Sequence, residues 1–150
     1  MTAAKRPGFI DSNVWIYAAT QSQDNPPDPR HKIARQLIAQ VHPCLSVQVI
    51  NEVTVNMLRK FSFSEAEIRS LVQSFYKNYT VFPLDADTFI KASTLREAYQ
   101  LSFWDSLIVG SALQHQCDLL YSEDMQNGLV IENQLQIHNP FTSEFSGLEQ

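Results

Sequence analysis

The sequence predicts an α/β fold in which a short parallel sheet of about five strands carries helices on both faces. Short apolar segments alternate along the whole chain with longer segments whose apolar residues recur at helical spacing. This alternation is typical of parallel sheets, because the connection between two parallel strands usually crosses the sheet as a helix. A length of 150 residues suits one domain with one core. We therefore expect a single domain over residues 1–150, with its core at about 8–141 and a tail at each end.

Local patterns place the expected strands and the first long helix. The strands are expected at residues 9–10, 44–47, 79–84, 117–121 and 135–138. Residues 20–30 contain three prolines in a polar run and are predicted to form a loop. Apolar residues at helical spacing then predict a helix over 31–41. This helix ends at His42, because a residue that precedes a proline disfavours helical geometry.

The later helices are predicted from their start signals. A helix is expected from about Gln48 to Lys60. Ser64 and Glu67 have the spacing of a capping box, which begins the following helix. Asp85 is expected to cap the next helix, with Phe89 turned inward. The last helix is expected over 106–115, directly after Asp105.

Composition excludes several classes of protein. With 44% hydrophobic and 18% charged residues, the chain is typical of a soluble globular protein. No apolar run approaches the ~20 residues of a membrane span, and no signal peptide is evident, so we expect a cytoplasmic protein without a membrane partner. The two cysteines, Cys44 and Cys117, lie far apart in apolar surroundings and are expected to be buried free thiols.

Charge is distributed unevenly along the chain. The net charge is −5, yet all eleven Lys and Arg lie within residues 1–96, whereas residues 97–150 hold eight acids and neither Lys nor Arg. This asymmetry permits a basic face around an acidic centre and argues against a uniformly basic coat for nucleic acid. Candidate contacts to RNA phosphates are Arg30, Lys32, Arg35, Arg59, Lys60, Lys91 and Arg96, although solvated positions or helix-end charges explain them equally well.

Four acids follow or precede elements at the same edge of the predicted sheet. Asp11 ends the first strand, and Glu52 lies in the first turn of the helix after the second strand. Asp105 begins the last helix, and Asp124 follows the strand 117–121. Functional residues of parallel sheets gather beyond the carboxyl ends of the strands. Because crowded carboxylates repel one another, we expect Mg²⁺ or Mn²⁺ among their oxygens. Such a site suits phosphodiester hydrolysis.

The segments around these acids resemble the PIN-domain ribonucleases. The resemblance is carried by FIDSNVWIYA, by Asn51-Glu52-Val53, by FWDSLIVGSAL and by LLYSEDM, and it runs from about Phe9 to Phe141. A short single-domain chain of this kind looks most like the VapC-type toxins of toxin–antitoxin pairs. The resemblance implies a three-layer PIN-like fold and a Mg²⁺- or Mn²⁺-dependent endoribonuclease. It also implies an RNA substrate, an antitoxin partner that inhibits the site, and a homodimer.

The resemblance also assigns roles to individual residues. Asp11, Glu52 and Asp105 match the acidic triad of the family, and Asp124 matches its fourth acid. All four are therefore expected to bind metal and to be catalytic. Small polar positions that would orient these carboxylates or water are matched by Ser12, Asn13 and Ser122. Glu123 would replace Asp124 if the loop turned differently.

Alternative interpretations remain for several of these residues. Asp105 has the position of a helix N-cap, with Trp104 and Val109 placed for a hydrophobic staple. Glu52 alone would be an ordinary first-turn acid, and Asp124 an ordinary loop acid. Trp15 and Trp104 are expected in the core, with base stacking left open for Trp104.

The whole chain also has alternative functions. It could be a PIN-like module that binds RNA or protein without catalysis, or a housekeeping RNA-processing nuclease. Phosphotransferases of the haloacid-dehalogenase type are disfavoured, because Asn13 occupies the place of their second Asp and no Lys follows Lys91. There is no glycine-rich phosphate loop and no GxSxG segment.

Overall fold

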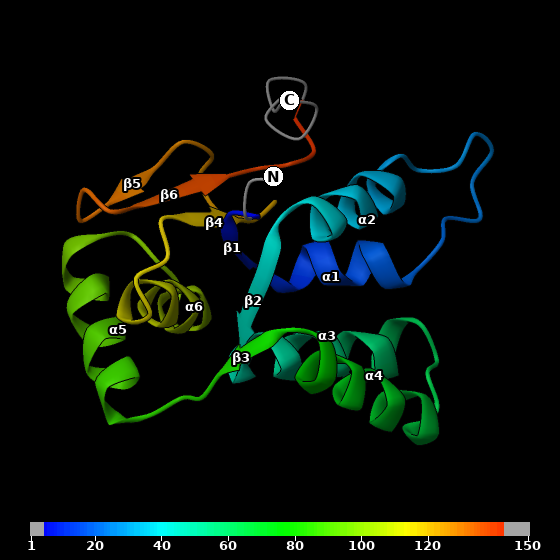
Figure 1. Cartoon of the computed structure of the whole chain (residues 1–150), viewed down its shortest axis with the longest axis horizontal. Helices are drawn as coiled ribbons and strands as arrows, with labels where there is room; N and C mark the ends of the chain where they lie inside the picture. Colours follow the sequence, from blue (N-terminus) through cyan, green and yellow to red (C-terminus); the bar gives the residue numbers. More distant parts are fainter. Residues whose placement is uncertain (1–4, 143–150) are drawn as a thin grey trace.

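The protein folds around one mostly parallel sheet flanked by six helices (Figure 1). The computed structural model describes residues 5–142. Its strands are β1 (Pro7–Ile10), β2 (His42–Ser46), β3 (Thr80–Phe82), β4 (Leu119–Tyr121), β5 (Val130–Ile131) and β6 (Leu135–His138). The helices are α1 (Ser12–Ala19), α2 (Arg30–Gln40), α3 (Val47–Lys60), α4 (Glu65–Asn78), α5 (Ala86–Ala98) and α6 (Phe103–Gln114).

The strand order is β3-β2-β1-β4-β6-β5, and β5 alone is antiparallel to its neighbour. The chain builds outward from β1 through β2 to β3 and then returns to place β4 on the other side of β1. This reversal between β1 and β4 is a topological switch point, where ligands of open α/β sheets bind. The expected α/β class and parallel sheet are confirmed, and the switch point sets the place of the site.

The sixth strand, β5, was not foreseen from the sequence. It pairs with β6 through a tight hairpin whose turn residues Glu132 and Asn133 have φ values of 52° and 55°. Positive φ at both central positions fits a type I′ turn, which matches the twist of two antiparallel strands. Only two residues form this strand, and a Glu at the first turn position is not a recognised hairpin signal.

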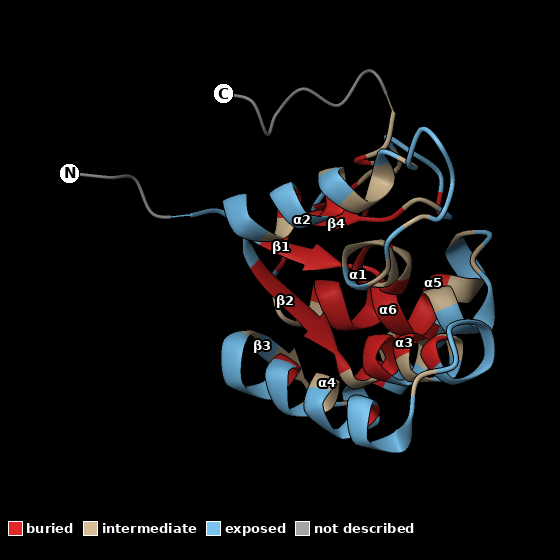
Figure 2. Ribbon diagram, turned by 90° about the vertical axis from the view of Figure 1, so that its right-hand side faces the viewer, coloured by how far each residue is buried: buried red, intermediate tan, exposed pale blue. Residues whose placement is uncertain are grey.

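The helices form layers on the two sides of the sheet. In Figure 1 the pair α1–α2 lies on one side and the pair α5–α6 on the other, whereas α3 and α4 lie beside β3. Figure 2 shows that β1, β2 and α6 are buried, whereas α4 is exposed along its outer side. The core is built from apolar side chains on both faces of the central strands, among them the fully buried Phe9, Ile10, Leu45 and Leu120.

Close contact between α5 and α6 fixes the position of α6. A Cβ at Gly110 of α6 would lie 3.3 Å from the backbone nitrogen of Ala92 and 3.4 Å from the carbonyl oxygen of Thr88, both in α5. Only glycine leaves room for this approach without a shift of the neighbouring backbone. Since Asp105 lies in the first turn of α6, the approach also fixes one of the candidate site residues.

The helix starts confirm some predictions and correct others. Ser64 and Glu67 form the expected capping box of α4, and Asp85 caps α5. The expected start of the last helix was wrong: α6 begins at Phe103, and its cap is Ser102. A serine three residues before an acid competes well as an N-cap, because its hydroxyl reaches the backbone N–H of that acid.

Two aromatic side chains also lie elsewhere than predicted. Trp15 is buried as expected, but Trp104 is 57% exposed and Phe89 is 49% exposed. Because α6 begins earlier than expected, Trp104 falls in the first turn of the helix, where it faces solvent. The expected hydrophobic staple between Trp104 and the buried Val109 is therefore not formed. Phe89 lies on the outer side of α5, where the helical pattern is not strongly amphipathic.

Cys44 and Cys117 are buried free thiols, as predicted, and their sulfur atoms lie 3.7 Å apart. Among the helices within residues 5–142, none is both long and apolar enough to span a membrane. The tail expected after residue 141 falls almost entirely outside the described part of the chain.

Candidate functional site

Asp11 occupies the junction of β1 and α1 at the switch point. The residue is 2% exposed, and its carboxyl group caps the N-terminus of α1 by accepting a hydrogen bond of 2.7 Å from the backbone N–H of Ser12. The other carboxyl oxygen accepts a 2.7 Å bond from the hydroxyl of Ser122, which follows β4. Asp11 therefore caps α1 and lies at the switch point in the same geometry.

Glu52 reaches the same place from α3. Because α3 begins at Val47, Glu52 lies in the second turn of the helix and not in the first turn as predicted. The Ser12 hydroxyl donates a 2.9 Å hydrogen bond to Oε1 of Glu52 and lies 3.4 Å from Asp11 Oδ1. Gln48, one turn earlier in α3, donates a 3.0 Å bond to Oε2. Ser12 thus links the two acids.

Asp105 faces these acids from the first turn of α6. It is half-buried, and its backbone N–H donates a 3.0 Å hydrogen bond to the hydroxyl of Ser102. The alternative interpretation of Asp105 as the helix cap is wrong, because Ser102 takes that role. An acid in the first turn of a helix is favoured by the helix dipole.

Asp124 and Glu123 point in different directions after β4. The side-chain amide of Asn13 donates a 3.0 Å hydrogen bond to Asp124 and accepts a 3.2 Å bond from the backbone N–H of Glu123. Glu123 itself accepts hydrogen bonds from the Tyr17 hydroxyl and from Arg30, away from the other acids. Of the two acids in this loop, Asp124 is therefore the one placed near Asp105.

The acids influence one another electrostatically. Burial raises the pKa of Asp11 to about 7, against the lowering effect of its bonds from Ser122 and Ser12, and the charges of Glu52 and Asp105 raise it further. Burial also raises the pKa of Asp105, with further contributions from Glu52 and Asp124. All four predicted acids thus lie within electrostatic range of at least one other. A cation among them would relieve the repulsion.

The carboxylate oxygens of the four acids suit a hard divalent ion, although they do not surround a single point closely. Carboxylate oxygens are the ligands that Mg²⁺ and Mn²⁺ prefer. Within residues 5–142, no three His, Cys, Asp or Glu side chains converge closely enough to hold a metal ion as they stand. Mg²⁺ often keeps several waters and uses only one or two carboxylates directly. The oxygen-rich, mutually repelling set therefore fits such an ion through a partly hydrated site.

A cleft of about 640 Å³ opens beside Glu52 and Asp105, between α3 and α6. The arrows of β1 and β2 in Figure 2 point to the side of the molecule where α1, α3 and α6 lie, so the cleft opens beyond the carboxyl edge of the sheet. The polar side chains Asn51, Asn56 and Arg59 line it together with the exposed ring of Trp104.

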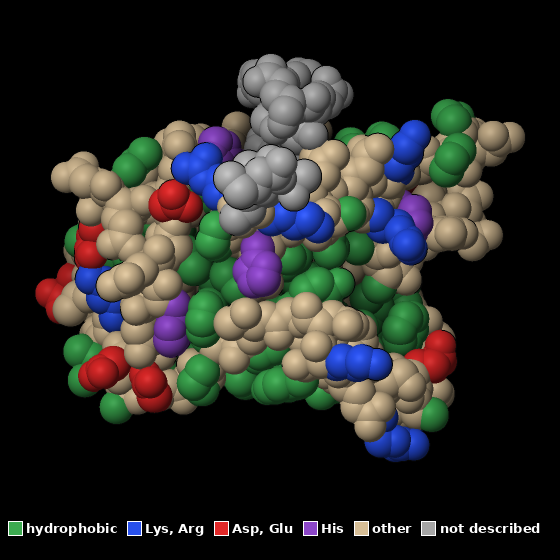
Figure 3. Space-filling model, viewed as in Figure 1, with side chains coloured by type: hydrophobic (Ala, Val, Ile, Leu, Met, Phe, Trp, Pro, Cys, Tyr) green, Lys and Arg blue, Asp and Glu red, His purple; other side chains and the backbone are tan. Residues whose placement is uncertain are grey.

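Some of the basic residues named as candidate RNA contacts already interact with other side chains, and others do not. Arg30 pairs with Asp28 and Glu123, Lys91 pairs with Glu132, and Arg96 donates a hydrogen bond to Ser106. Among residues 5–142, ion pairs are absent for Lys32, Arg35, Arg59 and Lys60. In Figure 3 Lys and Arg side chains lie on both sides of this face, whereas most visible Asp and Glu side chains lie to the left.

One contributor to the site was missed from the sequence, and another was expected in a different place. Gln48 holds Glu52, and its spacing of four residues on one helix is a signal that could have identified it. Trp104 was expected in the core, with base stacking left open, and the register of α6 places its ring at the cleft. The signal that could have identified this register is Ser102, three residues before Asp105.

These features define a class of protein: a mostly parallel α/β domain with carboxylates gathered at the switch point of its sheet. A family model described as the PIN domain matches residues 8–126. This match covers most of the chain, which therefore belongs to the PIN domain family. No protein with a curated description matches the chain.

Solved structures share this fold at low sequence identity. A chain of a toxin–antitoxin complex from Klebsiella pneumoniae has a TM-score of 0.67 at 15% identity, with 89% of this chain and 98% of that chain covered. VapC20 from Mycobacterium tuberculosis, a toxin that cleaves the sarcin-ricin loop, has a TM-score of 0.60 at 18% identity, with 78% and 91% covered. A chain of VapBC2 from Rickettsia felis, bound to a promoter DNA fragment, has a TM-score of 0.62 at 17% identity, with 89% and 98% covered.

The raised pKa of Asp11 predicts how stability depends on pH. Ionisation of this buried carboxyl is disfavoured in the folded state, so without divalent metal the free energy of unfolding should fall as pH rises from about 4 towards the folded pKa of about 7. In Asp11→Asn this loss should be absent, and at pH 8 the variant should be more stable than the wild type by up to about 4 kcal/mol. Urea denaturation in EDTA at several pH values measures both. Parallel curves for the two proteins would contradict the assignment.

Proposed function

We propose that this protein is a metal-dependent endoribonuclease that acts as the toxin of a toxin–antitoxin pair. The observation that carries the proposal is the meeting of Asp11, Glu52, Asp105 and Asp124 at the switch point of a PIN fold. The toxin–antitoxin context is supported by the structural neighbours, which include a toxin that cleaves the sarcin-ricin loop and chains from toxin–antitoxin complexes. We also propose that the protein acts in the cytoplasm, as expected for such a toxin.

The chain's own residues would hold and orient the reacting groups. Asp11, Glu52 and Asp105 would hold the ion, with Asp124 acting directly or through water. When bound, Mg²⁺ or Mn²⁺ would lower the pKa of a water nucleophile and stabilise charge on the phosphate oxygens.

Three neighbouring polar residues would keep these acids in place. Ser122 fixes one oxygen of Asp11, and Ser12 fixes the other and also holds Glu52. Asn13 orients Asp124. Such partners of ligands restrict rotation of the carboxylates and thereby preserve the geometry that binds the ion.

The acids should be necessary for cleavage but not for folding. Asp11→Asn and Asp105→Asn should each lower the rate of RNA cleavage by at least about 100-fold, since the loss of even an outer-shell partner costs 10- to 100-fold in metal affinity or activity. The readout is cleavage of total bacterial RNA in Mn²⁺, with circular dichroism to show that each variant is folded. Asp87→Asn, an exposed acid in the first turn of α5, is the matched control and should keep wild-type activity.

Two outcomes would contradict this proposal. Cleavage at the wild-type rate by a folded Asp105→Asn variant would remove that residue from the mechanism. A wild-type protein that cuts no RNA in either Mg²⁺ or Mn²⁺ would favour the PIN-like binding module without catalysis. A housekeeping nuclease would cut RNA but would not arrest growth when it is expressed alone.

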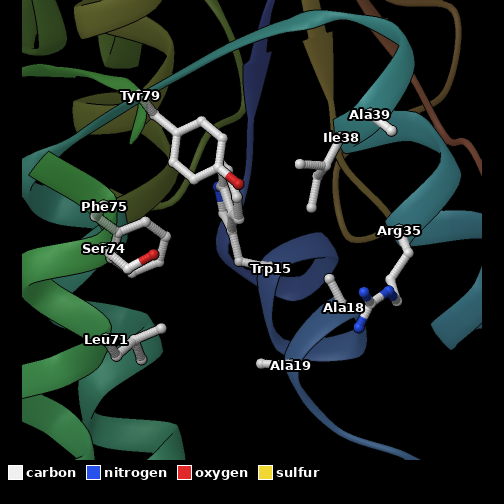
Figure 4. A pocket seen from close by; sticks show the side chains of 10 residues that line it. All are labelled: Trp15, Ala18, Ala19, Arg35, Ile38, Ala39, Leu71, Ser74, Phe75 and Tyr79. Atoms are coloured by element: carbon white, nitrogen blue, oxygen red, sulfur yellow. The ribbon is translucent and has the colours of Figure 1, made fainter. Parts of the chain in front are cut away.

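We expect the antitoxin to bind an apolar cavity beside α1. This cavity of about 420 Å³ lies between α1, α2 and α4, and Figure 4 shows Trp15, Ile38, Phe75 and Tyr79 around it. Arg35 at its rim has no ion pair among the described residues. We propose that the occupant is an antitoxin segment with apolar side chains and an acid that meets Arg35, because apolar pockets with a few polar groups bind such segments.

Charge reversal at the rim of this cavity should weaken the antitoxin complex. Arg35→Glu should raise the dissociation constant by at least about tenfold, since like charges across an interface cost several kcal/mol. Calorimetry with the protein encoded next to this chain would measure the change, and RNA cleavage by the free variant should be unaffected. Lys32→Glu, the same charge change on α2 outside the cavity, is the control. Equal affinities for both variants would exclude this surface.

Exposed apolar side chains also support the expected homodimer. Val55 and Leu58, one turn apart on α3, and Phe89 and Ile90 on α5 are each at least 37% exposed. Exposed apolar side chains that lie together on one element can mark a protein interface.

A further inference from the structure

Trp104 presents an exposed aromatic ring at the cleft beside Glu52 and Asp105. Trp104 follows Phe103 at the start of α6, and the two rings meet edge-to-face with centroids 5.0 Å apart. The Arg96 guanidinium lies 5.0 Å from the Phe103 ring and is itself held by a 2.8 Å hydrogen bond to Ser106. The indole is thus braced from one side, although 57% of its surface is exposed. A large aromatic face held in place towards solvent is available for stacking at little cost in side-chain entropy.

The cleft next to this ring carries polar groups without partners. The side chain of Asn51 makes no hydrogen bond within residues 5–142, and the side chain of Asn56 uses only its amide nitrogen, which donates a 2.8 Å bond to the carbonyl oxygen of Glu52. The amide groups of Asn51 and Asn56 can therefore donate to and accept from an edge of a base. Arg59 lies at the same cleft without an ion pair among those residues. These are the kinds of group that a single-stranded nucleotide needs: an aromatic face, amides and a cation.

We propose that the cleft between α3 and α6 is a base-binding subsite for single-stranded RNA, in which one base stacks on Trp104. The base edge would face Asn51 and Asn56, and Arg59 would contact a neighbouring phosphate. Asp105 adjoins Trp104 in the chain, so a base held here places its own phosphate beside the acids. The subsite rests on the proposed nuclease function and adds to it the feature of the substrate that is recognised: an unpaired base, not the backbone alone.

Binding of RNA to an inactive protein tests the subsite separately from catalysis. All variants carry Asp11→Asn, so that RNA is not cut. The probes are a fluorescein-labelled mixed-sequence RNA of 12 nucleotides and an abasic strand of the same length and charge. Fluorescence anisotropy gives the affinity for each probe. Tryptophan fluorescence reports stacking directly, because only Trp15 and Trp104 contribute and Trp15 is buried.

The expected results separate bases from phosphates. Trp104→Ala should weaken binding of the base-bearing RNA by roughly 5- to 150-fold and leave the abasic strand unchanged. Trp104→Phe should keep most of the affinity but lose the quenching that RNA causes in the parent protein. Arg59→Gln should weaken both probes to a similar degree, because it removes a phosphate contact.

Three results would overturn the subsite. Equal affinity of the Asp11→Asn parent and its Trp104→Ala derivative for base-bearing RNA, in a protein whose wild type cuts RNA, would refute the subsite and leave the nuclease proposal standing. Absence of RNA binding by the parent, together with absence of cleavage by the wild type, would refute both. A Trp104→Ala variant that loses a dimer in sedimentation while its RNA affinity is unchanged would assign the ring to self-association.

Discussion

The carboxyl group of Asp11 is buried at the end of the central strand, and the rest of the site is arranged around it. Its two oxygens are held by groups that follow β1 and β4, the two strands on either side of the switch point. Burying a carboxylate is costly unless the charge is neutralised or compensated. Two hydrogen bonds compensate only part of this cost, because the pKa is still raised to about 7. The fold therefore maintains a group that gains from a cation nearby.

Other elements place further negative charge around this group. α3 contributes Glu52 and α6 contributes Asp105, and Ser12 connects the first of these to Asp11 by a hydrogen bond. The position of α6 depends in turn on Gly110, which allows close contact with α5. Like charges gathered around a buried carboxyl group destabilise the isolated protein. In the proposed function a bound metal ion would relieve this repulsion, so that stability would be exchanged for function, as is common at catalytic sites.

The sequence predicted the features that follow from periodicity and chain order. Alternating strands and helices gave the sheet, and the carboxyl ends of parallel strands brought Asp11 and Asp124 to one edge. Two kinds of feature escaped prediction. The hairpin that forms β5 depends on tertiary pairing with β6, since two residues carry no periodicity. The start of α6 depends on which residue caps it. The predicted start was a few residues too late, and Trp104 was therefore expected in the core, whereas it lies at the surface.

The central claim is that these acids form one metal site, and calorimetric titration with Mn²⁺ tests it without knowledge of the RNA substrate. The proteins compared are the wild type, Asp105→Asn, and Glu123→Gln as a control for an acid that pairs with Arg30 instead. The account predicts saturable binding by the wild type and by Glu123→Gln, and its loss in Asp105→Asn. Absence of saturable binding by the wild type, or equal binding by Asp105→Asn, would contradict it.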